Sequence, residues 1–382
     1  MRQRAVRVER DVPMETRDGV VLRSDVCRPD DDLQYPVLLG RTPYGKSSWG
    51  GWLDPLRTAA EGYAVVVNDM RGGFASEGEF RPFFHDIDDG YDVVEWCARQ
   101  PWSNGRVGMF GSSAPGFMQL LAAAARPPHL VAIAPMQTWS SFGRGCVYDP
   151  GGAFLLYTQQ WALLLSSIDP ERRLDAAIDG YADRRELVAR GQWDPGWGWS
   201  GLPVGDFSAL NPEQSAFYHE WLDHPDHDEF WHPLDLEPRY ADIEVPALHL
   251  VGLYDKFRFG SVRNWTGLRT EGATALARDH QHLVLGPWTH GIPVRAQGSE
   301  EFFGIEAEID VRGLVLRWYD HWLKDLDTGI LDEPPVSVFV PGEDQWRQVA
   351  AWPPPTARPT EFFLRSDGEL TSEPPQDEVP DR

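Results

Sequence analysis

Cysteine is scarce in this chain of 382 residues, which contains only Cys27, Cys97 and Cys146. An odd number of widely spaced cysteines forms no disulfide framework, and their spacing matches no metal-ligand pattern. Long apolar runs are also missing, because no stretch approaches the length of a membrane span. The first residues, Met1 to Arg4, lead into charged residues rather than an apolar segment, so no signal peptide is expected. These features predict a soluble, cytoplasmic protein.

Positive charge is scarce as well. The chain has 35 Lys and Arg residues and 59 Asp and Glu residues, which gives a formal net charge of −24. A balance this negative argues against nucleic acid and against an anionic membrane as partners. Tryptophan, by contrast, is abundant, with 17 residues. Most tryptophans in any protein belong to the core, but several here cluster where a pocket is expected.

One stretch, Gly105 to Gly116, organises the rest of the chain. The apolar run Val107–Phe110 predicts a buried strand, and residues 117–125 predict a helix. Between them lies Ser113, flanked by glycines, which is the arrangement of a nucleophile elbow. The alternative is an ordinary strand-turn-helix in which the serine only caps the helix.

An acid and a histidine follow two later strands. The apolar run Ala247–Leu253 leads to Asp255, and a strand that starts at His282 leads to His290. Both residues therefore lie just past the C-terminal end of a strand, where open α/β sheets place their chemistry. The order Ser, Asp, His is that of the α/β-hydrolases. The sequence thus predicts a catalytic triad, whereas His249, inside a strand, is expected to be a buried core histidine.

The order of the other elements predicts an α/β fold. Residues 7–27 are expected to form a hairpin, with strands at 36–41, 63–69 and 129–135 and a helix over 86–99. Strands that alternate with helices give a mostly parallel sheet.

The domain organisation is expected to be an interrupted core. Strand-like runs disappear between residues 144 and 238, where helical stretches such as 173–190 take over. The predicted parts are a first core segment at 1–143, a helical cap at 144–238, a second core segment at 239–330, and the start of an incomplete β-rich domain at 331–382.

The chain resembles the CocE/NonD acyl hydrolases, which include cocaine-esterase-like enzymes, α-amino acid ester hydrolases and X-Pro dipeptidyl-peptidases. The resemblance extends in order over residues 12 to 350 and implies an α/β-hydrolase core. Its motifs are Arg41-Thr42-Pro43-Tyr44-Gly45, residues 71–78 (RGGFASEG), residues 102–111 (WSNGRVGMFG), Tyr254-Asp255 and Gly286-Pro287-Trp288-Thr289-His290.

The resemblance also implies roles for single residues. Ser113 would be the nucleophile, His290 the base and Asp255 the residue that orients it. The Tyr44 phenol and the Ala114 backbone N–H would form the oxyanion hole, where one donor contributes about 3 to 4 kcal/mol.

Three aromatic residues are candidates for the substrate pocket. Trp161 and Phe257 match acyl-pocket positions of cocaine-esterase-like members. Trp139 follows the strand after the nucleophile helix. For both tryptophans, plain core packing is the alternative.

The sequence departs from the family in two places. Many members have Tyr after the nucleophile, where this chain has Ala114 followed by Pro115. A residue before proline is pushed away from α geometry, although Pro115 itself fits a first helical turn. The family also carries a C-terminal jelly roll, of which this chain contains only the start, a truncated jelly-roll-like extension.

The predicted function is hydrolysis of small acyl esters through an acyl-serine intermediate, with no cofactor. The first alternative is an X-Pro dipeptidyl-peptidase or α-amino acid ester hydrolase. Cap acids such as Asp226, Asp228 and Glu229 could then bind the substrate ammonium. The second alternative is a non-catalytic or fragmentary member. A homodimer is a further prediction.

Overall fold

The computed structural model describes residues 4–47, 51–168, 203–207, 210, 212, 215–290, 297–298, 301–365 and 368–374. The strands of its main sheet are β1 (Val6–Glu15), β2 (Val21–Pro29), β3 (Tyr35–Thr42), β4 (Ala64–Asp69), β5 (Ser103–Ser112), β6 (Leu130–Met136), β7 (Ala247–Gly252), β8 (Gln281–Gly286), β11 (Val336–Val340) and β12 (Gln345–Val349). The helices are α1 (Pro55–Ala60), α2 (Asp86–Ala98), α3 (Ala114–Ala124), α4 (Leu156–Ile168), α7 (Ala216–Asp223), α8 (Arg258–Glu271), α9 (Ala275–Asp279) and α10 (Val311–Lys324).

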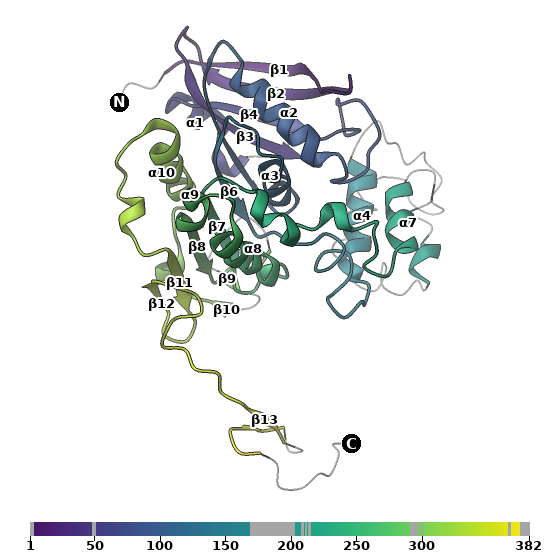
Figure 1. Cartoon of the computed structure of the whole chain (residues 1–382), viewed down its shortest axis with the longest axis vertical. Coiled ribbons are helices and arrows are strands. Elements are labelled where there is room, and N and C mark those ends of the chain that lie inside the picture. The colour runs from purple at the N-terminus through teal and green to yellow at the C-terminus, as the bar shows by residue number, and fades with distance from the viewer. Residues whose placement is uncertain are drawn as a thin grey trace.

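Ten strands form one continuous sheet in the order β1-β2-β4-β3-β5-β6-β7-β8-β11-β12 (Figure 1). Every pairing from β4 to β11 is parallel. The pairings at the two edges are antiparallel. The predicted α/β class is therefore confirmed, and the expected N-terminal hairpin is the pair β1 and β2.

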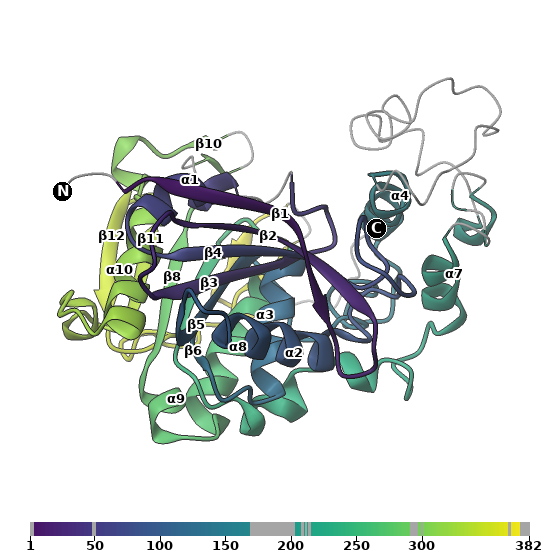
Figure 2. The same ribbon diagram turned by 90° about the horizontal axis from the view of Figure 1, so that it is seen from above.

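Both faces of the sheet are covered by helices, as parallel strands require. Successive side chains of a strand point to opposite faces. In β3, Val37 and Leu39 pack into the cluster that contains α2 and α3. Leu38, between them, joins the cluster with α1 and α10 on the other face (Figure 2). This double burial explains why the strands are apolar without interruption.

Two helices of the predicted cap range are described, α4 and α7, and they lie side by side at one end of the molecule (Figure 1, Figure 2). The indole rings of Trp161 in α4 and Trp221 in α7 stack with their centroids 5.7 Å apart. The expected helical stretch 173–190 lies outside the described residues.

The C-terminal boundary differs from the expected one. β11 pairs in parallel with β8, with Val336 opposite Leu283, so residues 336–349 extend the core sheet rather than start a separate domain. The reason is apolar burial, because Val336 and Val338 complete a cluster with Leu283 and Leu285. The short pair β13 (Phe363–Leu364) and β14 (Leu370–Thr371) lies away from this sheet (Figure 1).

Two further short strands, β9 (Gln297–Gly298) and β10 (Glu301–Phe302), pair with each other. None of the helices in the described ranges is both long and apolar enough to cross a bilayer. The other domain boundaries stay predictions.

Candidate active site

Ser113 lies in the sharp turn between β5 and α3. Its backbone has φ 64° and ψ −125°, a conformation that residues other than glycine rarely adopt. Hydrogen bonds hold this turn in place. The Ser113 N–H donates to the Met136 carbonyl at 2.9 Å, and the Ser113 carbonyl accepts from Thr138 Oγ1 at 2.9 Å. Such strain persists only where the surroundings enforce it, as at functional sites.

Two glycines allow the chain to pack this tightly. A Cβ on Gly111 would lie 2.5 Å from the Pro115 Cβ, and a Cβ on Gly116 would lie 2.8 Å from the Met136 carbonyl oxygen. Neither approach is tolerated by a real side chain, so both positions require glycine for close backbone contact.

The structure brings Ser113, His290 and Asp255 together. His290 Nε2 lies 3.1 Å from Ser113 Oγ, and His290 Nδ1 lies 3.0 Å from Asp255 Oδ1. Asp255 is fully buried, and its Oδ1 also accepts the Phe257 N–H at 2.9 Å. Distances in this range put a base within reach of the serine proton and a carboxylate within reach of the base.

Tyr44 reaches the same point from the loop after β3. Its hydroxyl oxygen accepts a hydrogen bond from Trp161 Nε1 at 3.0 Å, and its side chain lines the same cavity as Ser113. Burial raises the pKa of Tyr44, so the phenol stays neutral and keeps its proton. A neutral hydroxyl beside the nucleophile is a donor suited to a developing oxyanion.

Ala114 is the first residue of α3, and Pro115 is the second. Pro115 itself fits the first turn, because a proline there lacks only an N–H that the helix does not use. The effect of Pro115 on the backbone of Ala114 stays a prediction. Within the described ranges, the Ala114 N–H has no acceptor. Ala114 itself is buried and is not among the residues that line the cavity described next.

A cavity of about 300 Å³ opens at the triad, beneath α4. Trp139, Trp161 and Phe257, the three pocket candidates from the sequence, all line it. The complete lining is Tyr44, Ser113, Trp139, Cys146, Tyr157, Gln160, Trp161, Leu164, Lys256, Phe257 and His290.

One aromatic wall of the cavity, the Phe257 ring, contacts the imidazole of His290. The Phe257 ring lies edge-on to the His290 ring with centroids 4.9 Å apart, and edge-on to Trp139 at 4.8 Å. Rings in these arrangements give the cavity an apolar wall beside the imidazole and favour an apolar substrate portion.

Sequence reasoning missed Lys256, Tyr157, Cys146, Gln160 and Leu164. Four of these five gave no signal that separates them from ordinary helix and core residues. Lys256 did give one, because it lies between Asp255 and Phe257 and the chain has only three lysines.

The cap acids proposed for an ammonium lie elsewhere. Asp228 accepts from His224 at 2.7 Å, and Asp226 lines a different cavity with His227 and Trp231. Glu229 is exposed. None of the three lines the cavity at Ser113.

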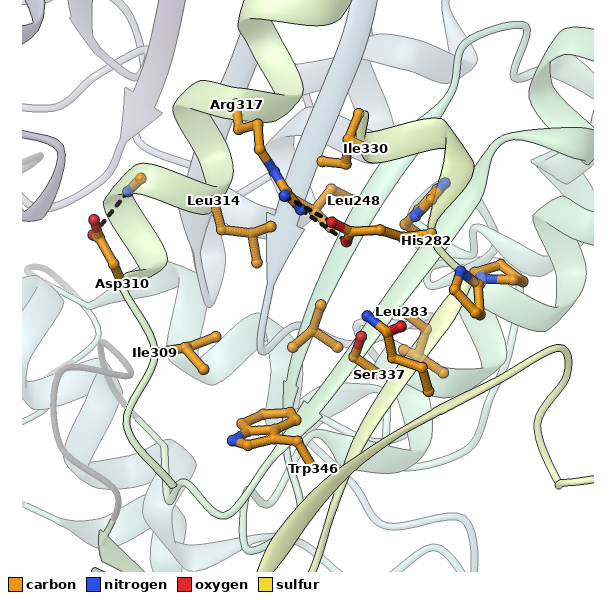
Figure 3. Close-up of a pocket in the computed structure, with 16 residues that line it drawn as sticks. Leu248, His282, Leu283, Ile309, Asp310, Leu314, Arg317, Ile330, Ser337 and Trp346 are labelled. Carbon is orange, nitrogen blue, oxygen red and sulfur yellow. Dashed lines mark hydrogen bonds and ion pairs between the residues drawn. The ribbon is translucent and has the colours of Figure 1, made fainter. Parts of the chain in front are cut away.

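A larger cavity of about 440 Å³ lies between α10, β8 and β11, and no triad residue lines it (Figure 3). Its wall is mainly aliphatic, with Leu248, Leu283 and Leu314. Of its charged groups, Arg317 and Glu333 pair with each other at 2.7 Å, and Asp310 accepts the Gly313 N–H at 2.8 Å. Apart from its apolar wall, this cavity therefore offers no set of unpaired charged side chains that could act together on a ligand.

Comparisons with known proteins agree with this geometry. The family described as X-Pro dipeptidyl-peptidase (S15 family) matches residues 18–292. Cocaine esterase of Rhodococcus sp. (strain MB1 Bresler) is 35% identical over 368 residues, which are 94% of this chain and 62% of that protein.

Two solved structures show the same fold. An α-amino acid ester hydrolase has a TM-score of 0.73 at 23% identity, covering 99% of this chain and 64% of the other. A CocE/NonD family hydrolase from Staphylococcus aureus has a TM-score of 0.68 at 21% identity, covering 94% of this chain and 59% of the other. The chain thus spans less than two thirds of the length of these relatives.

A strained serine elbow on a mostly parallel sheet, hydrogen-bonded to a histidine and a buried acid, defines an α/β-hydrolase fold with a serine-hydrolase type of site. The chain belongs to the X-Pro dipeptidyl-peptidase (S15) family, and the resemblance to CocE/NonD hydrolases is confirmed.

Proposed function

We propose that this protein is a serine hydrolase that cleaves small carboxylic esters through an acyl-enzyme on Ser113. The observation that supports this most strongly is the chain of hydrogen bonds from Ser113 Oγ through His290 to the buried Asp255. A hydroxyl becomes a useful nucleophile at neutral pH only when an oriented base can take its proton.

In the first half of the reaction, Ser113 Oγ attacks the ester carbonyl carbon while its proton moves to His290 Nε2. Asp255 Oδ1 keeps the Nδ1–H tautomer and stabilises the imidazolium that forms. The Tyr44 hydroxyl and the Ala114 N–H bind the oxyanion of the tetrahedral intermediate. His290 then protonates the alkoxide that leaves, and the acyl group remains on Ser113.

In the second half, a water molecule takes the place of the alcohol. His290 removes a proton from this water as it attacks the acyl carbon, and the proton then returns to Ser113 Oγ when the acid leaves. The water supplies the hydroxyl group of the released acid, and no other molecule apart from the ester is needed to balance the reaction.

An ester substrate is favoured over an aminoacyl or X-Pro substrate by one observation. Among the described residues that line the cavity, none is an Asp or Glu that could bind an α-ammonium group. A panel of p-nitrophenyl esters and an X-Pro-p-nitroanilide tests the choice. Hydrolysis of the esters is expected, and cleavage of the anilide alone would overturn it.

The non-catalytic alternative rested on Ala114-Pro115 and on the missing jelly roll. Against the first ground, Ala114 starts the helix and keeps an N–H without an acceptor in the described part of the chain. A cytoplasmic location and a homodimer stay predictions, for cell fractionation and light scattering to test.

A further inference from the structure

Lys256 lines the active-site cavity together with Ser113 and His290. Its Nζ lies 3.7 Å from the centroid of the Tyr157 ring and 5.1 Å from that of Phe257. The Phe257 ring also contacts the imidazole of His290, at 4.9 Å between centroids. A single phenyl ring thus separates a cationic side chain from the catalytic base.

No described carboxylate forms an ion pair with Lys256, and this distinguishes it from the other two lysines of the chain. Lys46 pairs with Asp69 at 2.7 Å and with Asp11 at 2.8 Å. Lys324 pairs with Asp320 at 2.8 Å. In a chain with 59 acidic residues, a lysine without an acidic partner is an exception.

The surroundings of Lys256 make an anion favourable beside it. Its side chain is exposed to the cavity, yet the surrounding protein desolvates the ammonium enough to lower its pKa. The Tyr157 ring face offsets part of this cost through a cation–π contact. An anionic group in the cavity would offset the remaining desolvation cost of the ammonium, because an ion pair is stronger where water is partly excluded.

The fixed charge on the wall of the cavity is therefore positive. Among the described residues that line the cavity, Lys256 is the only Lys, Arg, Asp or Glu. The cavity walls around it are aromatic and aliphatic, so a substrate chain can extend from Ser113 along apolar surface to the ammonium.

We propose that Lys256 selects ester substrates that carry an anionic group, such as a carboxylate, a few atoms from the scissile carbonyl. The proposal rests on the ester hydrolysis proposed above and specifies its substrate class. The anionic group can be part of the acyl chain or of the alcohol, and the chemistry at Lys256 is the same in both cases.

The test compares esters that differ in charge alone. For the acyl side these are p-nitrophenyl hydrogen adipate, p-nitrophenyl hexanoate and p-nitrophenyl 6-aminohexanoate. Adipate is chosen because shorter diacid half-esters react more readily with their own carboxylate. For the alcohol side, 3-carboxy-4-nitrophenyl hexanoate is compared with p-nitrophenyl hexanoate.

In the wild type, kcat/KM is expected to be about tenfold higher for the anionic ester than for the neutral ester in at least one series. Added salt should reduce this ratio. The series that shows the preference identifies which side of the substrate carries the anion.

Variants assign the preference to Lys256. The ratio should fall to about one in Lys256→Met, invert in favour of the aminohexanoate in Lys256→Glu, and be retained in Lys256→Arg. Lys324→Met, on α10, is the matched control and should keep the wild-type ratio. Because each ratio is measured within one protein preparation, a partly unfolded variant does not distort it.

Equal rates for all charges in the wild type, or a preference that persists unchanged in Lys256→Met, would overturn the proposal while ester hydrolysis stands. Hydrolysis of none of these esters would overturn the proposed function, and the substrate class would fall with it.

Discussion

The indole Nε1 of Trp161 donates a hydrogen bond to the hydroxyl oxygen of Tyr44 at 3.0 Å. This contact joins the cap helix α4 to the loop after β3. It occupies a lone pair of the phenol oxygen and so helps to direct its hydrogen toward the cavity that Ser113 also lines. Trp161 is therefore a positioning residue as well as a wall of the cavity.

Removal of this contact should slow the chemical step. We expect Tyr44→Phe to lower kcat by about 10²- to 10³-fold, the usual effect of losing one oxyanion donor. Trp161→Phe should lower kcat less, by about three- to tenfold, since the phenol remains but is less well oriented. Steady-state kinetics with a p-nitrophenyl ester measures both.

The matched control is Trp265→Phe. It also removes an indole hydrogen bond, from Trp265 Nε1 to the Gln281 carbonyl at 3.1 Å, but away from the cavity. This variant should lose stability and keep its kcat. Equal kcat values for Trp161→Phe and the wild type would contradict the positioning role.

Close packing of α3 on β6 should make Gly116 intolerant of a side chain. Gly116→Ala places a Cβ against the Met136 carbonyl, and backbone cannot move aside cheaply. The expected loss is about 1 to 3 kcal/mol in the free energy of unfolding. Urea denaturation checks it. In Gly205→Ala, the control, the nearest atom to the new Cβ lies 3.8 Å away, so little change is expected.

Two buried histidines should make the protein less stable in mild acid. Burial lowers the pKa of His249 and of His282 to about 4, from 6.5. The unfolded chain therefore binds more protons than the folded one between pH 6.5 and pH 4. Stability is complete above this window and is lost as the pH falls through it.

Between pH 7 and pH 5 the expected loss is about 2 kcal/mol for each histidine, from the size of the shift. Urea denaturation at the two pH values measures it. His249→Asn should reduce this dependence by about half, because His282 remains, whereas the exposed His232→Gln should leave it as in the wild type. If the stability of His249→Asn fell with pH as steeply as that of the wild type, His249 would not be a source of the acid sensitivity.

Local patterns in the sequence were sufficient to predict the nucleophile elbow and the order of the three triad residues along the chain. Glycines around Ser113 and apolar runs before Asp255 and His290 are strong signals, because a buried parallel strand leaves little choice of residue. The same patterns indicated the strands that form the centre of the sheet.

Contacts between segments that are distant in the sequence were harder to predict. Val336–Val340 has the same alternation in a core strand as in a separate sheet, and only its pairing with β8 decides between them. The effect of Pro115 on Ala114 was also open, since it depends on where the helix begins. Lys256 became significant only when the structure placed it in the wall of the cavity, with no ion pair to a described carboxylate.

The most direct test of the account is covalent labelling of the nucleophile. The protein is treated with a fluorophosphonate, its intact mass is measured, and the modified residue is located by peptide mapping. The account predicts one adduct on Ser113 in the wild type and none in Ser113→Ala. A folded wild-type protein that stays unlabelled, or one labelled at a different residue, would contradict it.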